Sequence, residues 1–134
     1  TLAEAKDKLS KGIHVLIREG SCAKDADVLL PLVDSYTSTT LGYCSDDRNP
    51  LDIEESGHLD CIVNMALKKR IDPISVFRAA SFGIANIFGL KDRGAIAPGY
   101  IADMVLVKAK SPNGDFEQGI TIENVWKNGS DLRE

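Results

Sequence analysis

The stretch Ile13-His14-Val15-Leu16-Ile17-Arg18-Glu19-Gly20-Ser21 decides the fold class of this chain. Its first five residues are rich in β-branched side chains, which predicts a strand buried on both faces, and the last four form a polar turn. A second strand, predicted over residues 39–44, also runs straight into polar residues, Ser45-Asp46-Asp47-Arg48. Apolar strands that alternate with helices are typical of parallel α/β packing, so we predict an α/β fold.

Apolar residues at helical spacing predict helices over residues 2–9, 26–33 and 58–70, with Pro31 kinking or restarting the second. Asp72-Pro73 begins a fourth helix as N-cap and first helical residue, and Gly89 lies just past its end. Short strands are predicted within residues 93–107 and over 120–127. A closed (β/α)8 barrel needs about 250 residues. We therefore expect residues 1–92 to be the last βα units of such a barrel and residues 93–134 to be a β-rich tail.

Composition excludes several classes of function. The formal net charge is −4 and no dense Lys/Arg run occurs, which argues against a nucleic-acid partner. No run of eighteen apolar residues occurs, so we expect no membrane span. The three cysteines, Cys22, Cys44 and Cys61, are odd in number and lack CxxC spacing, which fits reduced thiols in a cytoplasmic protein.

Polar clusters directly after the two strands are the candidate reactive groups, because such groups gather at the carboxyl ends of parallel strands. Side chains alternate along a strand, so Asp46 and Asp47 are expected to point to opposite sides. A carboxylate facing the barrel axis can bind a metal and accept a proton from water. The alternative is ordinary turn or helix-capping chemistry before Asn49-Pro50. For Arg18-Glu19, the alternative to a role in the site is a surface ion pair. His58 is open to three interpretations: a helix cap, a supporting contact or a solvated side chain.

Three motifs resemble the microbial adenine deaminases of the amidohydrolase superfamily. The first is Ile17-Arg18-Glu19-Gly20-Ser21 with Ala23-Lys24-Asp25, and the second is Cys44-Ser45-Asp46-Asp47-Arg48-Asn49-Pro50 followed by Glu55-Ser56-Gly57-His58-Leu59-Asp60. The third, which starts at Leu90 and ends at Ala102-Asp103, looks like that family's link from barrel to β-subdomain. The third motif is the least specific, since its GxIxxGxxAD pattern recurs in many amidohydrolases. The resemblance covers nearly the whole chain.

The resemblance implies the C-terminal part of a (β/α)8 metal-dependent barrel plus strands of a small β-sandwich, with residues 13–17 as strand seven and 41–44 as strand eight. It also implies hydrolysis of adenine to hypoxanthine and ammonia with a divalent metal such as manganese, iron or zinc. On this mapping Asp46 is the metal ligand and catalytic proton shuttle. The residues implied in substrate binding are Asp47, Arg18, Glu19 and Ser21.

The chain departs from the family pattern because the HxH ligands, the bridging acidic ligand and the other histidines are missing from it. Asp46 alone cannot hold a catalytic metal, since a site needs about three protein ligands. We therefore expect a C-terminal fragment that is inactive and binds no metal alone, within a parent that deaminates adenine. Two alternatives stay open: another amidohydrolase acting on a cyclic amide or nucleobase, and a non-catalytic domain that associates through strand edges. An isolated half-barrel is expected to form a homo-oligomer.

Overall fold

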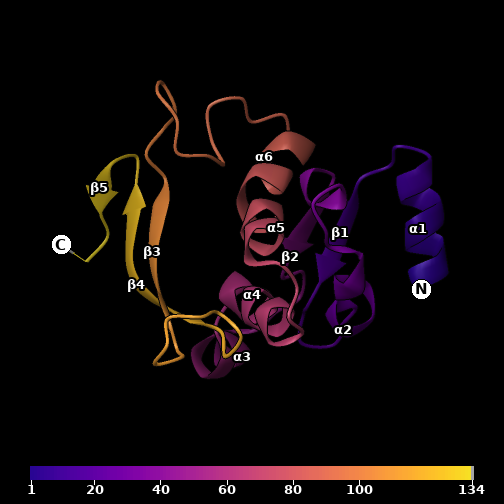
Figure 1. Ribbon diagram of the computed structural model, residues 1–134, viewed down its shortest axis with the longest axis horizontal. Coiled ribbons are helices and arrows are strands. Elements are labelled where there is room, and N and C mark those ends of the chain that lie inside the picture. The colour runs from indigo at the N-terminus through magenta and orange to yellow at the C-terminus, as the bar shows by residue number, and fades with distance from the viewer. Residues whose placement is uncertain (134) are drawn as a thin grey trace.

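Two parallel strands, β1 (Val15–Arg18) and β2 (Leu41–Cys44), form the centre of the N-terminal part of the chain in the computed structural model, which describes residues 1–133 (Figure 1). Val15 pairs with Leu41 and Arg18 with Cys44, so the predicted parallel pairing is confirmed. Both strands begin two residues later than predicted, because residues 13–14 lie in an exposed link outside the strand and Thr37–Thr39 forms a 3-10 turn, η2.

The two faces of this small sheet differ in their burial. Val15, Ile17, Leu41 and Tyr43 point toward the helices and are buried. Leu16 points the other way and is 38% exposed, so the prediction that the first strand is buried on both faces is wrong. The physical reason is that side chains alternate along a strand. Among the described residues the Leu16 face is covered only in part, by Ile84, which packs against Gly42.

The helices that cover the sheet follow the predicted apolar patterns closely. The first, α1 (Leu2–Ser10), begins with a capping box between Thr1 and Glu4. The predicted break at Pro31 is present, since α2 (Ala26–Leu29) passes into the 3-10 turn η1 (Leu30–Leu32). Residues 58–70 contain α4 (Leu59–Lys68), as predicted. One further helix, α3 (Pro50–Ser56), was not predicted; it buries no residue and so has no apolar stripe to reveal it.

The fourth predicted helix is divided into α5 (Pro73–Arg78), a π-helical turn η3 (Ala79–Gly83) and α6 (Ile84–Ile87). It begins as predicted, because Asp72 Oδ2 accepts a hydrogen bond from the Ser75 N–H at 2.8 Å. The π-helical turn packs directly on β2. A Cβ added at Gly83 would lie 2.4 Å from the Leu41 carbonyl oxygen, so only glycine permits this approach.

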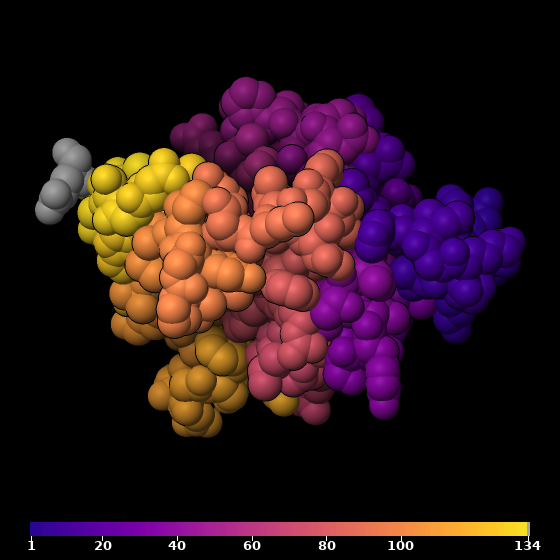
Figure 2. Space-filling model, turned by 90° about the horizontal axis from the view of Figure 1, so that it is seen from above, coloured from indigo at the N-terminus to yellow at the C-terminus, as the bar shows by residue number. Residues whose placement is uncertain are grey.

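The C-terminal part is an antiparallel sheet of β3 (Met104–Ala109), β4 (Ile120–Lys127) and β5 (Ser130–Asp131). Asn128 and Gly129, both with positive φ, form the predicted turn between β4 and β5. Asn64 of α4 connects the two parts by accepting a hydrogen bond from the Ile120 N–H at 2.6 Å. The space-filling view shows the N-terminal helix and the C-terminal sheet at opposite ends of the molecule (Figure 2).

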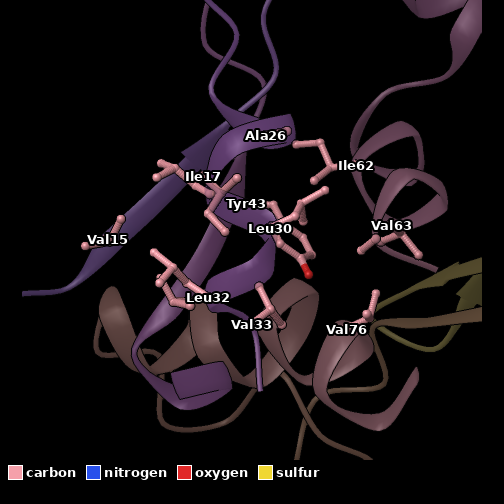
Figure 3. Packing of buried hydrophobic residues seen from close by; sticks show 14 of the residues in the cluster. Val15, Ile17, Ala26, Leu30, Leu32, Val33, Tyr43, Ile62, Val63 and Val76 are labelled. Carbon is pink, nitrogen blue, oxygen red and sulfur yellow. The ribbon is translucent and has the colours of Figure 1, made fainter. Parts of the chain in front are cut away.

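The main core lies between the β1–β2 sheet and helices α2, α4 and α5. Figure 3 shows Ile17 and Tyr43 from the strands among Leu30, Ile62 and Val76 from the helical layer. Each of these five side chains is at most 2% exposed. Within residues 1–133, no helix combines the length and the apolar character that a membrane crossing requires.

Candidate active site

A hollow of about 470 Å³ lies at the carboxyl ends of β1 and β2, on the sheet face that carries Leu16. Leu16, Arg18 and Cys44 line it from the strands, and Asp25 and Asp46 line it from the loops that follow them. The position agrees with the expectation that reactive groups follow parallel strands. Burial raises the pKa of the Cys44 thiol above its usual range, so this thiol is a poor nucleophile.

Arg18 connects two carboxylates in this hollow. Its Nη1 donates to Asp46 Oδ2 at 2.8 Å, and its Nη2 lies 3.2 Å from Asp25 Oδ2. The hydrogen bond to Asp46 is the main reason that the pKa of Arg18 is raised. Glu19 does not pair with Arg18; it is buried, and Lys24 Nζ lies 3.8 Å from its Oε1. The suggested Arg18–Glu19 surface pair is therefore wrong.

Asp46 lies beyond the end of β2, in the left-handed backbone region with φ = 48°. The two neighbouring aspartates do point to different places, as expected. The expected reason is wrong, however, because strand alternation ends at Cys44 and the left-handed turn at Asp46 separates the two side chains. Asp46 thereby faces Arg18 and the hollow.

Asp47 joins the loop after β2 to the loop after β1. Its Oδ1 accepts from the Ser21 N–H at 3.1 Å and its Oδ2 from the Cys22 N–H at 3.0 Å. The backbone hydrogen bond from Cys22 is the main reason that the pKa of Asp47 lies below its usual range. The carboxylate lies directly over Gly20, where an added Cβ would be 1.8 Å from Oδ1.

Ser21 strengthens the same junction between the loops. Its hydroxyl donates to the Asp52 carboxylate and accepts from the Asn49 N–H at 2.9 Å. Of the residues predicted to form the site, Arg18 and Asp46 therefore meet in the hollow. Glu19, Ser21 and Asp47 lie in the adjoining contact between the loops instead.

Two features of the site were missed by sequence reasoning. Asp25 enters the hollow, and its only sequence signal is its place in the Ala23-Lys24-Asp25 motif. Arg48 binds backbone carbonyls of Glu19, after β1, and of Gly57, at the end of α3, and nothing in its spacing indicates this. Of the alternatives left open for His58, the structure favours a supporting contact: it precedes α4 without capping it through its side chain, and its Nε2 lies 2.9 Å from Ser45 Oγ.

A metal site is not complete in the described part of the chain. Asp46 is a carboxylate donor of suitable chemistry, but residues 1–133 contain no group of three His, Cys, Asp or Glu side chains that could hold an ion. Its nearest cation is the Arg18 guanidinium. The residues present therefore do not fit a catalytic metal by themselves, and Asp46 would supply one ligand at most.

Comparison with protein families gives a clear match: a model described as the amidohydrolase family matches residues 1–130. The chain belongs to the amidohydrolase family. Among solved structures, enamidase, described as a member of the amidohydrolase superfamily, has a TM-score of 0.65 over 96% of this chain and 36% of its own. At 20% identity, that likeness shows that this amidohydrolase segment shares the superfamily's fold.

Relatives with more similar sequences are adenine deaminases, which confirms the resemblance read from the motifs. Adenine deaminase 1 of Rhizobium johnstonii is 50% identical over 107 residues, 80% of this chain and 19% of that protein. The adenine deaminase of a Methylobacterium species is 54% identical over 105 residues, 78% of this chain and 19% of that protein. This amidohydrolase chain thus spans about a fifth of the length of the relatives it matches.

Proposed function

We propose that this chain is the C-terminal part of an adenine deaminase, which hydrolyses adenine to hypoxanthine and ammonia. The observation that carries the proposal is the identity of about 50% with adenine deaminases over more than three quarters of the chain. The Arg18–Asp46 pair in the hollow supports it, because it places a carboxylate where amidohydrolase chemistry requires one.

The proposed architecture is the end of a (β/α)8 barrel followed by strands of a small β-sandwich. Residues 1–92 would supply β1 and β2 as the seventh and eighth barrel strands, and residues 93–134 would supply the sandwich strands. The unequal burial of the two faces of β1 and β2 supports this proposal, since the less buried face carries Leu16 and Arg18 as the inward face of a barrel would. The separate antiparallel sheet β3–β5 supports the second part.

In this enzyme Asp46 would be the catalytic carboxylate that accepts a proton from the attacking water. Arg18 would orient Asp46 and meet the substrate at the wall of the hollow. A divalent metal, manganese, iron or zinc, would take Asp46 as this chain's contribution and its other ligands from elsewhere in the protein. The free thiols Cys22, Cys44 and Cys61 fit a cytoplasmic setting.

The test is an assay of the full-length protein with adenine, guanine, cytosine and hydantoin. We expect release of ammonia and formation of hypoxanthine from adenine alone. Turnover of hydantoin or of another base in place of adenine would assign the chain to a different amidohydrolase. That alternative is favoured by the 90–103 motif, which is shared widely in the superfamily.

A further inference from the structure

Asp46 occupies a backbone conformation that needs support from its surroundings. Its φ of 48° lies in the left-handed region, where residues with a side chain are uncommon and persist only when neighbouring structure holds them. The conformation matters because it turns the carboxylate toward Arg18, with Asp46 Oδ2 and Arg18 Nη1 2.8 Å apart. The support must come from residues on either side of Asp46.

Arg48 provides the most extensive support. Its Nε donates to the Gly57 carbonyl at 2.9 Å, its Nη1 to the Glu19 carbonyl at 3.3 Å and its Nη2 to the Asp52 carbonyl at 3.2 Å. These three carbonyls belong to the loop after β1, to α3 and to the end of α3. One guanidinium therefore fixes the segment after Asp46 against the loop that follows β1 and against α3.

Asp47 fixes the same segment from its other side, through the Ser21 and Cys22 N–H groups. Each of its carboxylate oxygens already accepts one of these bonds. This arrangement differs from the purine contact that the sequence predicts for Asp47. Neither Asp47 nor Arg48 lines the hollow, so any effect of theirs on chemistry there must act through Asp46.

We propose that Arg48 and Asp47 are positioning residues, which hold Asp46 in its left-handed conformation and direct its carboxylate into the hollow. Only the kinetic test of this proposal rests on the proposed deaminase function; the structural test does not. The three guanidinium nitrogens reach three separate carbonyls, and a lysine ammonium in the same place retains the charge without that fork. Arg48→Lys therefore removes the geometry while it preserves the charge.

The test compares Arg48→Lys with Arg78→Lys in the full-length protein. Arg78 is a matched control because its Nη1 also bonds the Ser35 carbonyl and the Ser38 hydroxyl, before the opposite end of β2. For Arg48→Lys we expect kcat for adenine to fall about 10- to 100-fold, since small misplacements of a reacting group have effects of that size. We expect KM to change less than about threefold, with metal content preserved. Arg78→Lys should leave kcat at the native value.

Crystal structures of the two variants give a readout that does not depend on activity. The proposal expects Asp46 to leave the left-handed region and its Oδ2 to move away from Arg18 Nη1 in Arg48→Lys only. An Arg48→Lys variant with native kcat, or one whose Asp46 keeps φ near 48° and the 2.8 Å contact, overturns it. If the native protein does not deaminate adenine, the proposed function fails, and the crystal structures alone decide the positioning role.

A second variant covers the case in which Arg48→Lys does not fold. Gly20→Ala leaves Arg48 intact, but its Cβ would enter the space of Asp47 Oδ1. Displacement of Asp47 should then break the bonds from the Ser21 and Cys22 N–H groups and shift Asp46 in the same way. A folded Gly20→Ala variant that moves Asp47 and keeps both Asp46 in place and the native kcat contradicts the proposal.

Discussion

At the residue scale, Asp46 and Asp47 show how two identical neighbouring side chains acquire different chemistry. Asp47 has a backbone N–H on each oxygen, so both of its oxygens already accept a hydrogen bond within the protein. Asp46 has one cationic partner, Arg18, and otherwise faces an open hollow. Of these two neighbours, Asp46 is the one placed to exchange a proton with a molecule bound there.

This contrast predicts the outcome of two substitutions in the full-length enzyme. Asp46→Asn removes the proton acceptor, and we expect kcat to fall by at least about 10²- to 10⁴-fold. It should also lower the metal content, because the amide is a weaker ligand. Asp47→Asn should give a smaller fall in kcat with metal content near normal. Kinetics beside metal analysis by mass spectrometry distinguish the two variants.

Two results would contradict that assignment. If Asp46→Asn keeps both metal and rate while Asp47→Asn loses both, the roles of the two aspartates are reversed. If neither substitution matters, the pair serves only the turn before α3, which is the capping alternative that the sequence left open.

Tyr43 presents a second contrast at the residue scale, between a polar atom and its apolar surroundings. Its side chain is 2% exposed, and its hydroxyl has no hydrogen-bond partner among the described residues. Burial raises the pKa of this phenol well above its usual range. Figure 3 shows the hydroxyl among the apolar side chains of the core. An unpaired buried hydroxyl destabilises the folded state by about 1–3 kcal/mol.

We therefore predict that Tyr43→Phe leaves the melting temperature unchanged or raises it, although a core residue is altered. Tyr36→Phe is the matched control, because Tyr36 is 88% exposed and its hydroxyl is hydrated in either state. Thermal unfolding followed by circular dichroism measures both variants. A clear fall in the melting temperature of Tyr43→Phe alone would show that the hydroxyl has a partner, such as a buried water.

At the scale of elements, Asp103 connects the start of β3 to the turn between β4 and β5. Its Oδ2 accepts from Lys127 Nζ at 2.6 Å and from Arg93, and its Oδ1 accepts from the Asn128 N–H at 2.9 Å. The Lys127 hydrogen bond, followed by that from Asn128, lowers the pKa of Asp103 to about 2. The charged carboxylate is therefore the form that stabilises this sheet.

The lowered pKa predicts a specific acid sensitivity. The folded pKa lies below the unfolded value of about 4, so the stabilisation is complete above that value and is lost as pH falls toward 2. Asp103→Asn should lower the melting temperature at neutral pH, and its melting temperature should fall less than that of the native protein between pH 4 and 2. Asp7→Asn, which alters an exposed Lys11 pair on α1, should retain the native acid profile. If the plots of melting temperature against pH run parallel for all three proteins, Asp103 contributes nothing to the acid sensitivity.

The elements that sequence analysis predicted are those with a local signal. The apolar stripe of α4, the Asp72 cap of α5 and the Asn128-Gly129 turn each depend on residues close in sequence. The division of the fourth helix was not predictable, because it follows from the approach of Gly83 to carbonyls of β2 and η2 about forty residues earlier. Local periodicity contains no information about such long-range packing.

The candidate site likewise combines features with a local signal and features without one. The clustering of polar residues after two strands predicted where the hollow lies. The partners within it depend on parallel register, which places Arg18 beside Cys44 and so within reach of Asp46, 28 residues along the chain. The left-handed turn at Asp46 decides which aspartate faces the hollow, and an aspartate pair gives no sign of that turn in its spacing.

At the scale of the whole molecule, the described residues provide one part of the proposed reaction site. Among residues 1–133, Asp46 and Asp25 are the only carboxylates that line the hollow. We therefore predict that the isolated 134-residue chain releases no ammonia from adenine, with or without added manganese, iron or zinc. An assay of ammonia release that compares the isolated chain with the full-length protein measures this. Metal-dependent deamination by the isolated chain at an enzymatic rate would refute the prediction and the proposed dependence on ligands elsewhere.

The isolated chain should also associate with itself, because its surface carries apolar side chains on both sheets. Leu16 is 38% exposed on the open face of β1, while Val105 and Ile122 are 54% and 42% exposed on β3 and β4. Within residues 1–133, β1 and β2 pair only with each other, so β1 has an edge free for another strand, whereas Gly83 packs against the outer edge of β2. Apolar surface and a free strand edge both favour contact between copies.

We expect a dimer or a larger assembly at micromolar concentration, measured by light scattering. Leu16→Lys places a charge on the open strand face and should shift the population toward monomer if that face forms the contact. Val105→Lys makes the same change on β3 and distinguishes the two surfaces. If the native chain is a monodisperse monomer at this concentration, neither surface drives association and the prediction is wrong.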